Sequence, residues 1–206
     1  MIKNIIFDWS GVINDSVNNH LFIVNEIFKK FNIKEINLNE LRENWEQPYM
    51  FFYNKYLPNL TLNDEQIAYK QAVKKCPENN PFPGMVDLLK KFKREGIKMA
   101  ILSSDFQETI LSEIKSFGLD NLFVDIVTGM HDKNKSLIAM LKRNNFDKKE
   151  TVFVGDSNHE IEVGKNVGIK TASVTWGFSP EKKLSNLNPD FIIHNLSELK
   201  SLILKN

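Results

Sequence analysis

The sequence predicts an α/β protein with a Rossmann-like, doubly wound parallel sheet and a helical cap inserted after the first strand. Short apolar runs rich in β-branched residues alternate along most of the chain with amphipathic segments. This alternation is typical of βαβ units, whose parallel sheet is covered on both faces. One stretch after the first apolar run contains only helical patterns. It predicts a separate helical unit inserted into the α/β core.

Six segments have the length and composition of buried strands. They cover residues 4–7, 97–102, 122–127, 151–154, 171–175 and 191–193. Apolar residues at three- and four-residue spacings predict helices over 85–95, 109–117 and 137–144. Gly96, Gly118 and Gly168 follow helix-like segments, where a left-handed C-terminal cap favours glycine.

The helical patterns of the insert predict a cap over residues 17–80, which leaves residues 1–16 and 81–206 as the catalytic core. Helix-like segments cover 17–31, 39–56 (interrupted at Pro48) and 63–76. Six aromatic residues crowd between residues 45 and 56, and most of them are expected to form the core between the cap helices. Arg42, Gln47 and Lys55 are candidates for substrate specificity.

Composition and charge narrow the class of function. Lys plus Arg number 27 and Asp plus Glu number 26, so no net field favours nucleic acid or an anionic membrane. The single cysteine, Cys76, excludes an internal disulfide and fits a reducing compartment. The apolar run at residues 5–7 stops at Asp8, and no stretch approaches the roughly 20 apolar residues that span a bilayer. We therefore expect a cytoplasmic protein.

Polar side chains follow three of the predicted strands, at the sheet edge where ligands bind in such folds. They are Asp8 and Ser10 after the first strand, Ser103, Ser104 and Asp105 after the second, and Asp156 with Glu160 after the fourth. A single Asp or Ser after a strand is often just a helix N-cap with no catalytic role. Three converging carboxylates, however, repel one another unless a cation lies among them. Hard oxygen ligands favour Mg²⁺, which also bridges phosphoryl oxygens.

These segments resemble the motifs of the haloacid dehalogenase superfamily over almost the whole chain. IIFDWSGVINDS is similar to the first motif, a strand followed by DxDG(T/V), and PFPGMVDLLKKFKREGIKMAILSSD to the segment that carries the second. VFVGDSNHEIEVGKNVGIKTASVTWGF is similar to the acidic fourth motif. The third motif is one lysine. Lys133 fits it better than Lys135, because it precedes Asp156 by the 23 residues usual in the family. The insert corresponds to the C1 type of helical cap.

The resemblance, which is strongest to the phosphoglycolate phosphatase, β-phosphoglucomutase and phosphonatase-like group, implies a Mg²⁺-dependent hydrolase of a small phosphorylated metabolite. Asp8 would attack phosphorus to give an aspartyl-phosphate that water then hydrolyses. The implied metal ligands are Asp8, the backbone carbonyl of Ser10, Asp156 and Glu160. The implied phosphoryl-binding groups are Ser103, the amide of Ser104, and Lys133.

Ser10 departs from the family pattern. Family phosphatases place a second Asp there, as general acid for the leaving group and then general base for water, a contribution of roughly 10²–10⁴ in rate. If no other residue supplies that proton, alkyl phosphates should be poor substrates, and Ser10→Asp should improve them.

Three interpretations stay open on the sequence alone. The first is a phosphatase. The second is cleavage of a phosphonate C–P bond, because phosphonoacetaldehyde hydrolases carry a similar DWAG sequence and form a Schiff base on a cap lysine. No cap-lysine motif is identifiable among Lys29, Lys30, Lys34 and Lys55. The third is a catalytically degenerate protein that binds a phosphorylated ligand. The sequence specifies neither the substrate nor the oligomeric state.

Overall fold

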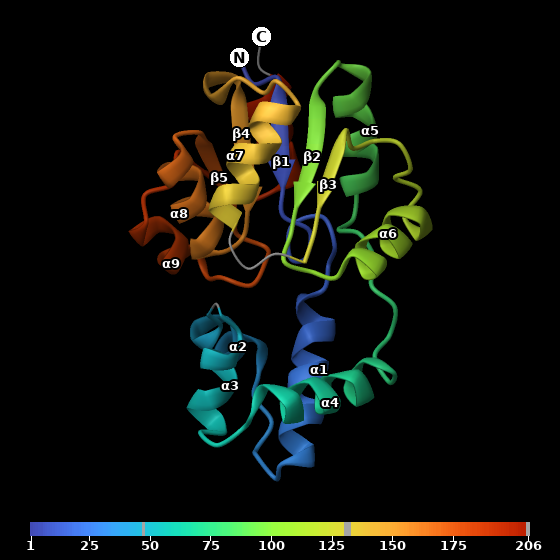
Figure 1. The fold of residues 1–206 in the computed structure, drawn as a ribbon, viewed down its shortest axis with the longest axis vertical. Coiled ribbons are helices and arrows are strands. Elements are labelled where there is room, and N and C mark those ends of the chain that lie inside the picture. The colour runs from blue at the N-terminus through green and yellow to red at the C-terminus, as the bar shows by residue number, and fades with distance from the viewer. Residues whose placement is uncertain (47, 130–132, 205–206) are drawn as a thin grey trace. The chain divides into compact units, whose positions relative to one another are not determined.

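The computed structural model describes residues 1–46, 48–129 and 133–204. The chain divides into two compact units (Figure 1). Each unit forms its own apolar core. The first unit contains Met1–Asp15 and Asn80–Asn206 and holds the sheet. The second unit, Ser16–Asn79, is helical. Gln47, one of the candidate specificity residues, lies outside the described residues.

The first unit is built on a six-stranded sheet in the order β3-β2-β1-β4-β5-β6. Its strands are β1 (Asn4–Phe7), β2 (Lys98–Leu102), β3 (Asp125–Val127), β4 (Thr151–Gly155), β5 (Lys170–Val174) and β6 (Phe191–Ile193). Each neighbouring pair is parallel, which confirms the predicted α/β fold. β3 is shorter than predicted, because Leu122 and Phe123 pack against the core before the chain pairs with β2.

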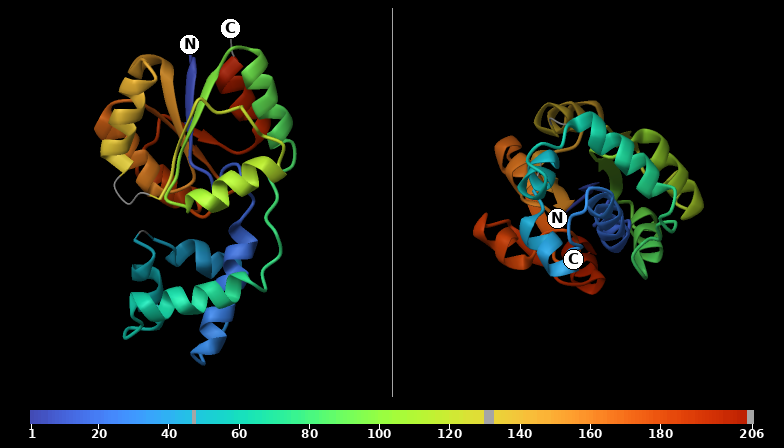
Figure 2. Two further views of the ribbon diagram at one scale, coloured as in Figure 1. Left: turned by 45° about the vertical axis from the view of Figure 1, so that its right-hand side comes forward. Right: turned by 90° about the horizontal axis from the view of Figure 1, so that it is seen from below.

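Helices cover both faces of this sheet (Figure 2). They are α5 (Met85–Arg94), α6 (Gln107–Ser116), α7 (Lys133–Arg143), α8 (Asn158–Val167), α9 (Glu181–Asn186) and α10 (Leu196–Leu204). Successive side chains of a strand point to opposite faces. Ile5 and Phe7 therefore join a core with α5, α6 and α10, whereas Ile6 joins a core with α7 and α8.

The helical unit consists of α1 (Val17–Lys30), α2 (Leu38–Asn44), α3 (Met50–Tyr56) and α4 (Leu62–Val73). The predicted segment 39–56 is two helices, since α2 ends at Asn44, before Pro48. Aromatic rings form much of its core, as expected: Phe28 stacks on Phe52 with ring centroids 6.2 Å apart. Phe51 is the exception, with 59% of its surface exposed.

The turn residues match the sequence analysis. Gly96, Gly118 and Gly168 all have positive φ, and Gly168 is the C-cap of α8. Within the described ranges, no helix is both long enough and apolar enough to cross a membrane.

Candidate active site

Asp8 lies on a tight loop that follows the central strand β1. The backbone carbonyl of Trp9 accepts hydrogen bonds from the amides of Val12, Ile13 and Asn14, at 3.2, 3.0 and 3.1 Å. The Asp8 carboxylate accepts a hydrogen bond from the Trp9 amide through Oδ1, at 2.7 Å. The loop therefore orients the carboxylate while leaving its Oδ2 atom for other partners.

A carboxylate from α6 fixes this loop. Glu113 accepts hydrogen bonds from the indole Nε1 of Trp9 at 2.5 Å and from the side-chain Nδ2 of Asn14 at 3.1 Å. The Trp9 ring also stacks on Phe117, with centroids 5.9 Å apart. Because Trp9 and Asn14 are the two ends of the turn, α6 holds the segment that carries Ser10 in place.

Two further acids reach Asp8 from β4 and α8. Asp156 directly follows β4, Glu160 lies in the first turn of α8, and both are buried. One carboxylate oxygen from each of Asp8, Asp156 and Glu160 lies within 4.8 Å of the others. A capping box orients Glu160, because its Oε2 accepts hydrogen bonds from the hydroxyl and the amide of Ser157, at 2.5 and 3.2 Å.

Lys133, at the start of α7, places a buried ammonium between two of these acids. Its Nζ lies 2.7 Å from Asp8 Oδ2 and 2.6 Å from Glu160 Oε1. Only 3% of the Lys133 side chain is exposed, against 14% for Asp8 and 4% for Glu160. Lys135, the alternative lysine, is exposed.

Burial and the neighbouring charges shift the pKa values of the three acids in different directions. Burial raises the pKa of Asp8 to about 7, although Lys133 acts in the opposite direction. Burial, followed by repulsion from Glu160 and Asp8, raises the pKa of Asp156 well above its usual range. Burial also opposes ionisation of Glu160, but Lys133 and the Ser157 hydrogen bond outweigh it and lower the pKa of Glu160 to about 2. Burial disfavours the charged form of Lys133, but the two acids overcome this and raise its pKa.

Three glycines provide the space that the acids occupy. A Cβ atom at Gly11 or Gly177 would lie 2.3 or 2.1 Å from Oδ2 of Asp156, and one at Gly155 would lie 2.3 Å from Cγ of Glu160. In real proteins, Cβ atoms essentially never lie this close to another heavy atom. The amide of Phe178, next to Gly177, donates to Asp156 Oδ2 at 2.6 Å. The chain therefore approaches the two acids so closely that only glycine fits.

The donor set suits a hard divalent cation. Among the residues that the structure describes, three carboxylates face one ammonium, which cannot neutralise all of them. A carboxylate oxygen has about two acceptor sites. Glu160 Oε2 uses both on Ser157, whereas each oxygen of Asp8 has one donor partner among residues 1–46, 48–129 and 133–204. Oxygen ligands of this kind match Mg²⁺ in chemistry.

The hydroxyl-bearing residues predicted for the site lie at the ends of β1 and β2. Ser103 is buried, and Ser104 beside it is exposed. The hydroxyls of Ser10 and Ser103 both donate to Oδ2 of Asp105, at 2.8 and 3.1 Å. The structure therefore joins the predicted residues in two groups. Asp8, Lys133, Glu160 and Asp156 form the charged cluster, and Ser10 and Ser103 meet at Asp105.

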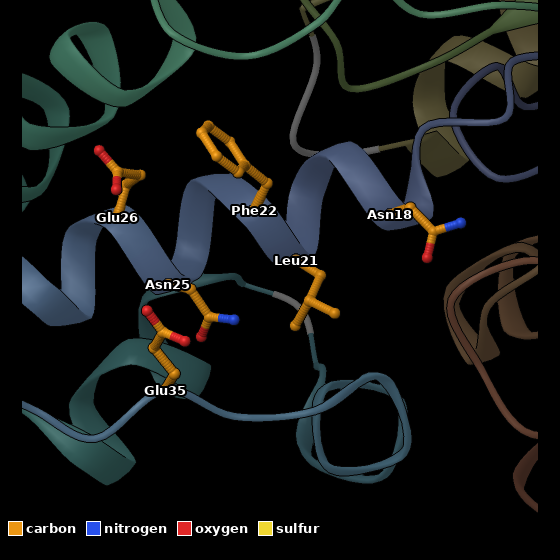
Figure 3. Close-up of a pocket in the computed structure, with 6 residues that line it drawn as sticks. All are labelled: Asn18, Leu21, Phe22, Asn25, Glu26 and Glu35. Carbon is orange, nitrogen blue, oxygen red and sulfur yellow. The ribbon is translucent and has the colours of Figure 1, made fainter.

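Two of the candidate specificity residues, Arg42 and Lys55, lie in the described part of the helical unit. Lys55 pairs at the surface with Glu46, at 2.8 Å. A hollow of about 250 Å³ on the same unit lies against α1 (Figure 3). Its lining residues include Glu26 and Glu35 but no basic side chain.

Comparisons with known proteins show which family and which fold this chain resembles. The model of the haloacid dehalogenase-like hydrolase family matches residues 5–174. A pyrophosphatase PpaX from Halalkalibacterium halodurans is 30% identical over 129 residues, which span 60% of each chain. A phosphoglycolate phosphatase from Synechococcus elongatus is 28% identical over 203 residues, covering 96% of this chain and 95% of the relative. A haloacid dehalogenase-like hydrolase structure from Streptococcus pneumoniae has a TM-score of 0.81, with 21% identity and 98% coverage of both chains.

We expect Gly177→Ala to weaken divalent-cation binding by about 10-fold or more, because its Cβ would displace the Asp156 carboxylate. Calorimetric titration with Mg²⁺ measures the effect. Gly96→Ala is a control that replaces a glycine away from the acids. Its positive φ of 77° disfavours alanine, but no atom lies within 4 Å of the added Cβ, so the affinity for Mg²⁺ should stay unchanged. Affinity equal to the parent's in Gly177→Ala would show that Asp156 does not need its present position.

Proposed function

The chain belongs to the haloacid dehalogenase-like hydrolase family, and on this basis we propose that it is a Mg²⁺-dependent phosphatase of a small phosphorylated metabolite. One observation carries the proposal. A buried lysine contacts the Asp8 carboxylate at 2.7 Å, beside two further acids at the carboxyl edge of the sheet. A carboxylate so placed can attack phosphorus and form an aspartyl-phosphate.

Lys133 makes that attack electrostatically feasible. An anionic carboxylate and a phosphoryl group repel each other, and a fixed ammonium between them offsets the repulsion. Its contact with Glu160 keeps the ammonium in place while Asp8 changes charge during the reaction. Ser103, the amide of Ser104 and Lys133 are the proposed donors to the phosphoryl oxygens.

The proposed metal ligands are Asp8, the backbone carbonyl of Ser10, Asp156 and Glu160. A bound Mg²⁺ would neutralise phosphoryl charge and orient the substrate. The protein holds the carboxylates of Asp156 and Glu160 in position through the close glycine contacts, the Phe178 amide and the Ser157 capping box.

The relatives support a small phosphorylated substrate. Those described above are named for pyrophosphate and phosphoglycolate, two small phosphorylated compounds. We propose that the helical unit, residues 17–80, acts as the cap that selects the leaving group, and that the protein works in the cytoplasm on neither nucleic acid nor membrane.

Asp8→Asn tests the nucleophile. The amide keeps the shape but cannot attack phosphorus, so kcat should fall by about 10³-fold or more. Hydrolysis of para-nitrophenyl phosphate, with circular dichroism as the folding check, measures this. Asp120→Asn makes the same change at an exposed site and should keep full activity. A folded Asp8→Asn variant with parental turnover would refute the covalent route.

Mg²⁺ should stabilise the native protein, by about 2.7 kcal/mol when its concentration is 100 times its dissociation constant. The double variant Asp156→Asn/Glu160→Gln should lose this gain, because it removes two charges from the cluster. Thermal denaturation with and without Mg²⁺ is the measurement. The exposed pair Asp87→Asn/Glu95→Gln controls for net charge. An undiminished Mg²⁺ effect in the cluster variant would place the metal elsewhere.

The phosphonate alternative predicts a lysine imine. Within the helical unit, Lys29, Lys30, Lys34 and Lys55 are all exposed, whereas a Schiff-base lysine is usually activated by a desolvated site or a neighbouring cation. Borohydride added with phosphonoacetaldehyde should therefore leave the protein mass unchanged. A reduced adduct on one of these lysines would favour C–P cleavage over phosphate hydrolysis.

A further inference from the structure

Glu113 of α6 binds both ends of the turn that follows Asp8. Its Oε2 accepts a hydrogen bond from Trp9 Nε1 at 2.5 Å, and both of its carboxylate oxygens lie 3.1 Å from Asn14 Nδ2. Trp9 directly follows Asp8, the proposed nucleophile. Asn14 closes the turn, since its backbone carbonyl accepts a hydrogen bond from the Gly11 amide at 2.9 Å. One carboxylate of α6 therefore holds the turn at its beginning and at its end.

The indole of Trp9 makes this contact directional. Its ring is fully buried, stacked on Phe117 and edge-on to Phe123. Aromatic neighbours pack against the ring but do not accept strongly from its N–H group, and a buried donor without an acceptor is unfavourable. The indole carries a single donor. The hydrogen bond to Glu113 therefore fixes where Trp9 lies relative to α6, which packing alone would leave less defined.

Trp9 in turn orients the nucleophile. Its backbone amide donates to Asp8 Oδ1 at 2.7 Å, while Asp8 Oδ2 contacts the Lys133 ammonium, also at 2.7 Å. A shift of the Trp9 backbone would therefore turn the Asp8 carboxylate. Two hydrogen bonds link Glu113 through Trp9 to Asp8. The proposed phosphoryl donors Ser103 and Lys133 belong to other segments, after β2 and at the start of α7.

We propose that Glu113 is a positioning residue, which acts through Trp9 to align the Asp8 carboxylate for attack on phosphorus. This inference rests on the proposed phosphatase function. Attack requires reacting atoms about 3–3.5 Å apart with aligned orbitals, and a misplacement of about 1 Å can cost roughly 100-fold in rate. Substrate binding depends on Ser103 and Lys133. Loss of the Glu113 contact should therefore lower kcat and leave KM nearly unchanged.

Glu113→Gln tests this inference with little change in shape. The new amide oxygen can still accept from Trp9, but the amide nitrogen turns a donor toward the Asn14 Nδ2 donor, so the two side chains no longer match. We expect kcat for para-nitrophenyl phosphate to fall about 10-fold while KM changes by less than about 2-fold. Glu95→Gln makes the same substitution at an exposed position of the same unit, and should keep the parental kcat and KM.

A reversed pair provides the rescue. Asn14→Asp alone places a carboxylate against that of Glu113, and because the two repel, kcat should fall here as well. In the double variant Glu113→Gln/Asn14→Asp, the new carboxylate accepts from the new amide, whose oxygen still accepts from Trp9. We expect kcat of the double variant to recover to within about 3-fold of the parent's, a coupling that the double-mutant cycle measures.

Trp9→Phe tests the second link of the chain, because it removes the indole donor and keeps an aromatic ring. It should lower kcat about 10-fold with little change in KM. Adding Glu113→Gln to Trp9→Phe should lower kcat less than the same substitution does in the parent, because the ring at position 9 no longer depends on the carboxylate.

The outcomes separate alignment from stability, with kcat compared at a temperature where circular dichroism shows each variant folded. If the parent does not hydrolyse the ester, the proposed phosphatase function fails, and this inference fails with it. With an active parent, a purely structural role would lower the melting temperature of Glu113→Gln and leave its kcat parental, which would overturn the inference. So would a reversed pair that does not recover the rate. Should Glu113→Gln not fold, Trp9→Phe decides the matter, and a parental kcat there also overturns the inference.

Discussion

The contact of buried Lys133 with Asp8 and Glu160 is the interaction on which the rest of the site depends. Burying charges is unfavourable unless they are paired and hydrogen-bonded. One ammonium cannot neutralise three carboxylates, so hydrogen-bond donors around the acids also stabilise their negative charge. The capping box of α8 and the amide of Phe178 are two such donors, both supplied by the backbone and loops around the strand ends.

Much of this site follows from the sequence because parallel strands end at one edge. Asp8 and Asp156 directly follow β1 and β4, two parallel neighbours in which Phe7 pairs with Val154. The topology of the sheet is therefore enough to bring the two acids together. The 23 residues between Lys133 and Asp156 favour Lys133 over Lys135. In the structure, Lys133 is buried and Lys135 is exposed.

Other parts of the site depend on side-chain packing that no local pattern encodes. Glu113 bonds Trp9 across 104 residues, and Asp105 meets Ser10 across 95. No spacing of residues along the chain predicts either contact, although Asp105 belongs to a loop that the sequence predicts at the sheet edge. Gly177 was part of a quoted motif, but its close approach to Asp156 appears only in three dimensions. The short helix α9 and helix α10 were not predicted either.

We propose that the buried acids hold a divalent cation beside Asp8, and a crystal soaked in Mn²⁺ would locate this cation. Mn²⁺ takes the same hard oxygen ligands as Mg²⁺ and gives an anomalous signal. We expect one strong peak within about 2.5 Å of carboxylate oxygens of Asp8 and Asp156. The absence of a peak there, at a Mn²⁺ concentration that supports hydrolysis, would show that these acids do not bind the metal.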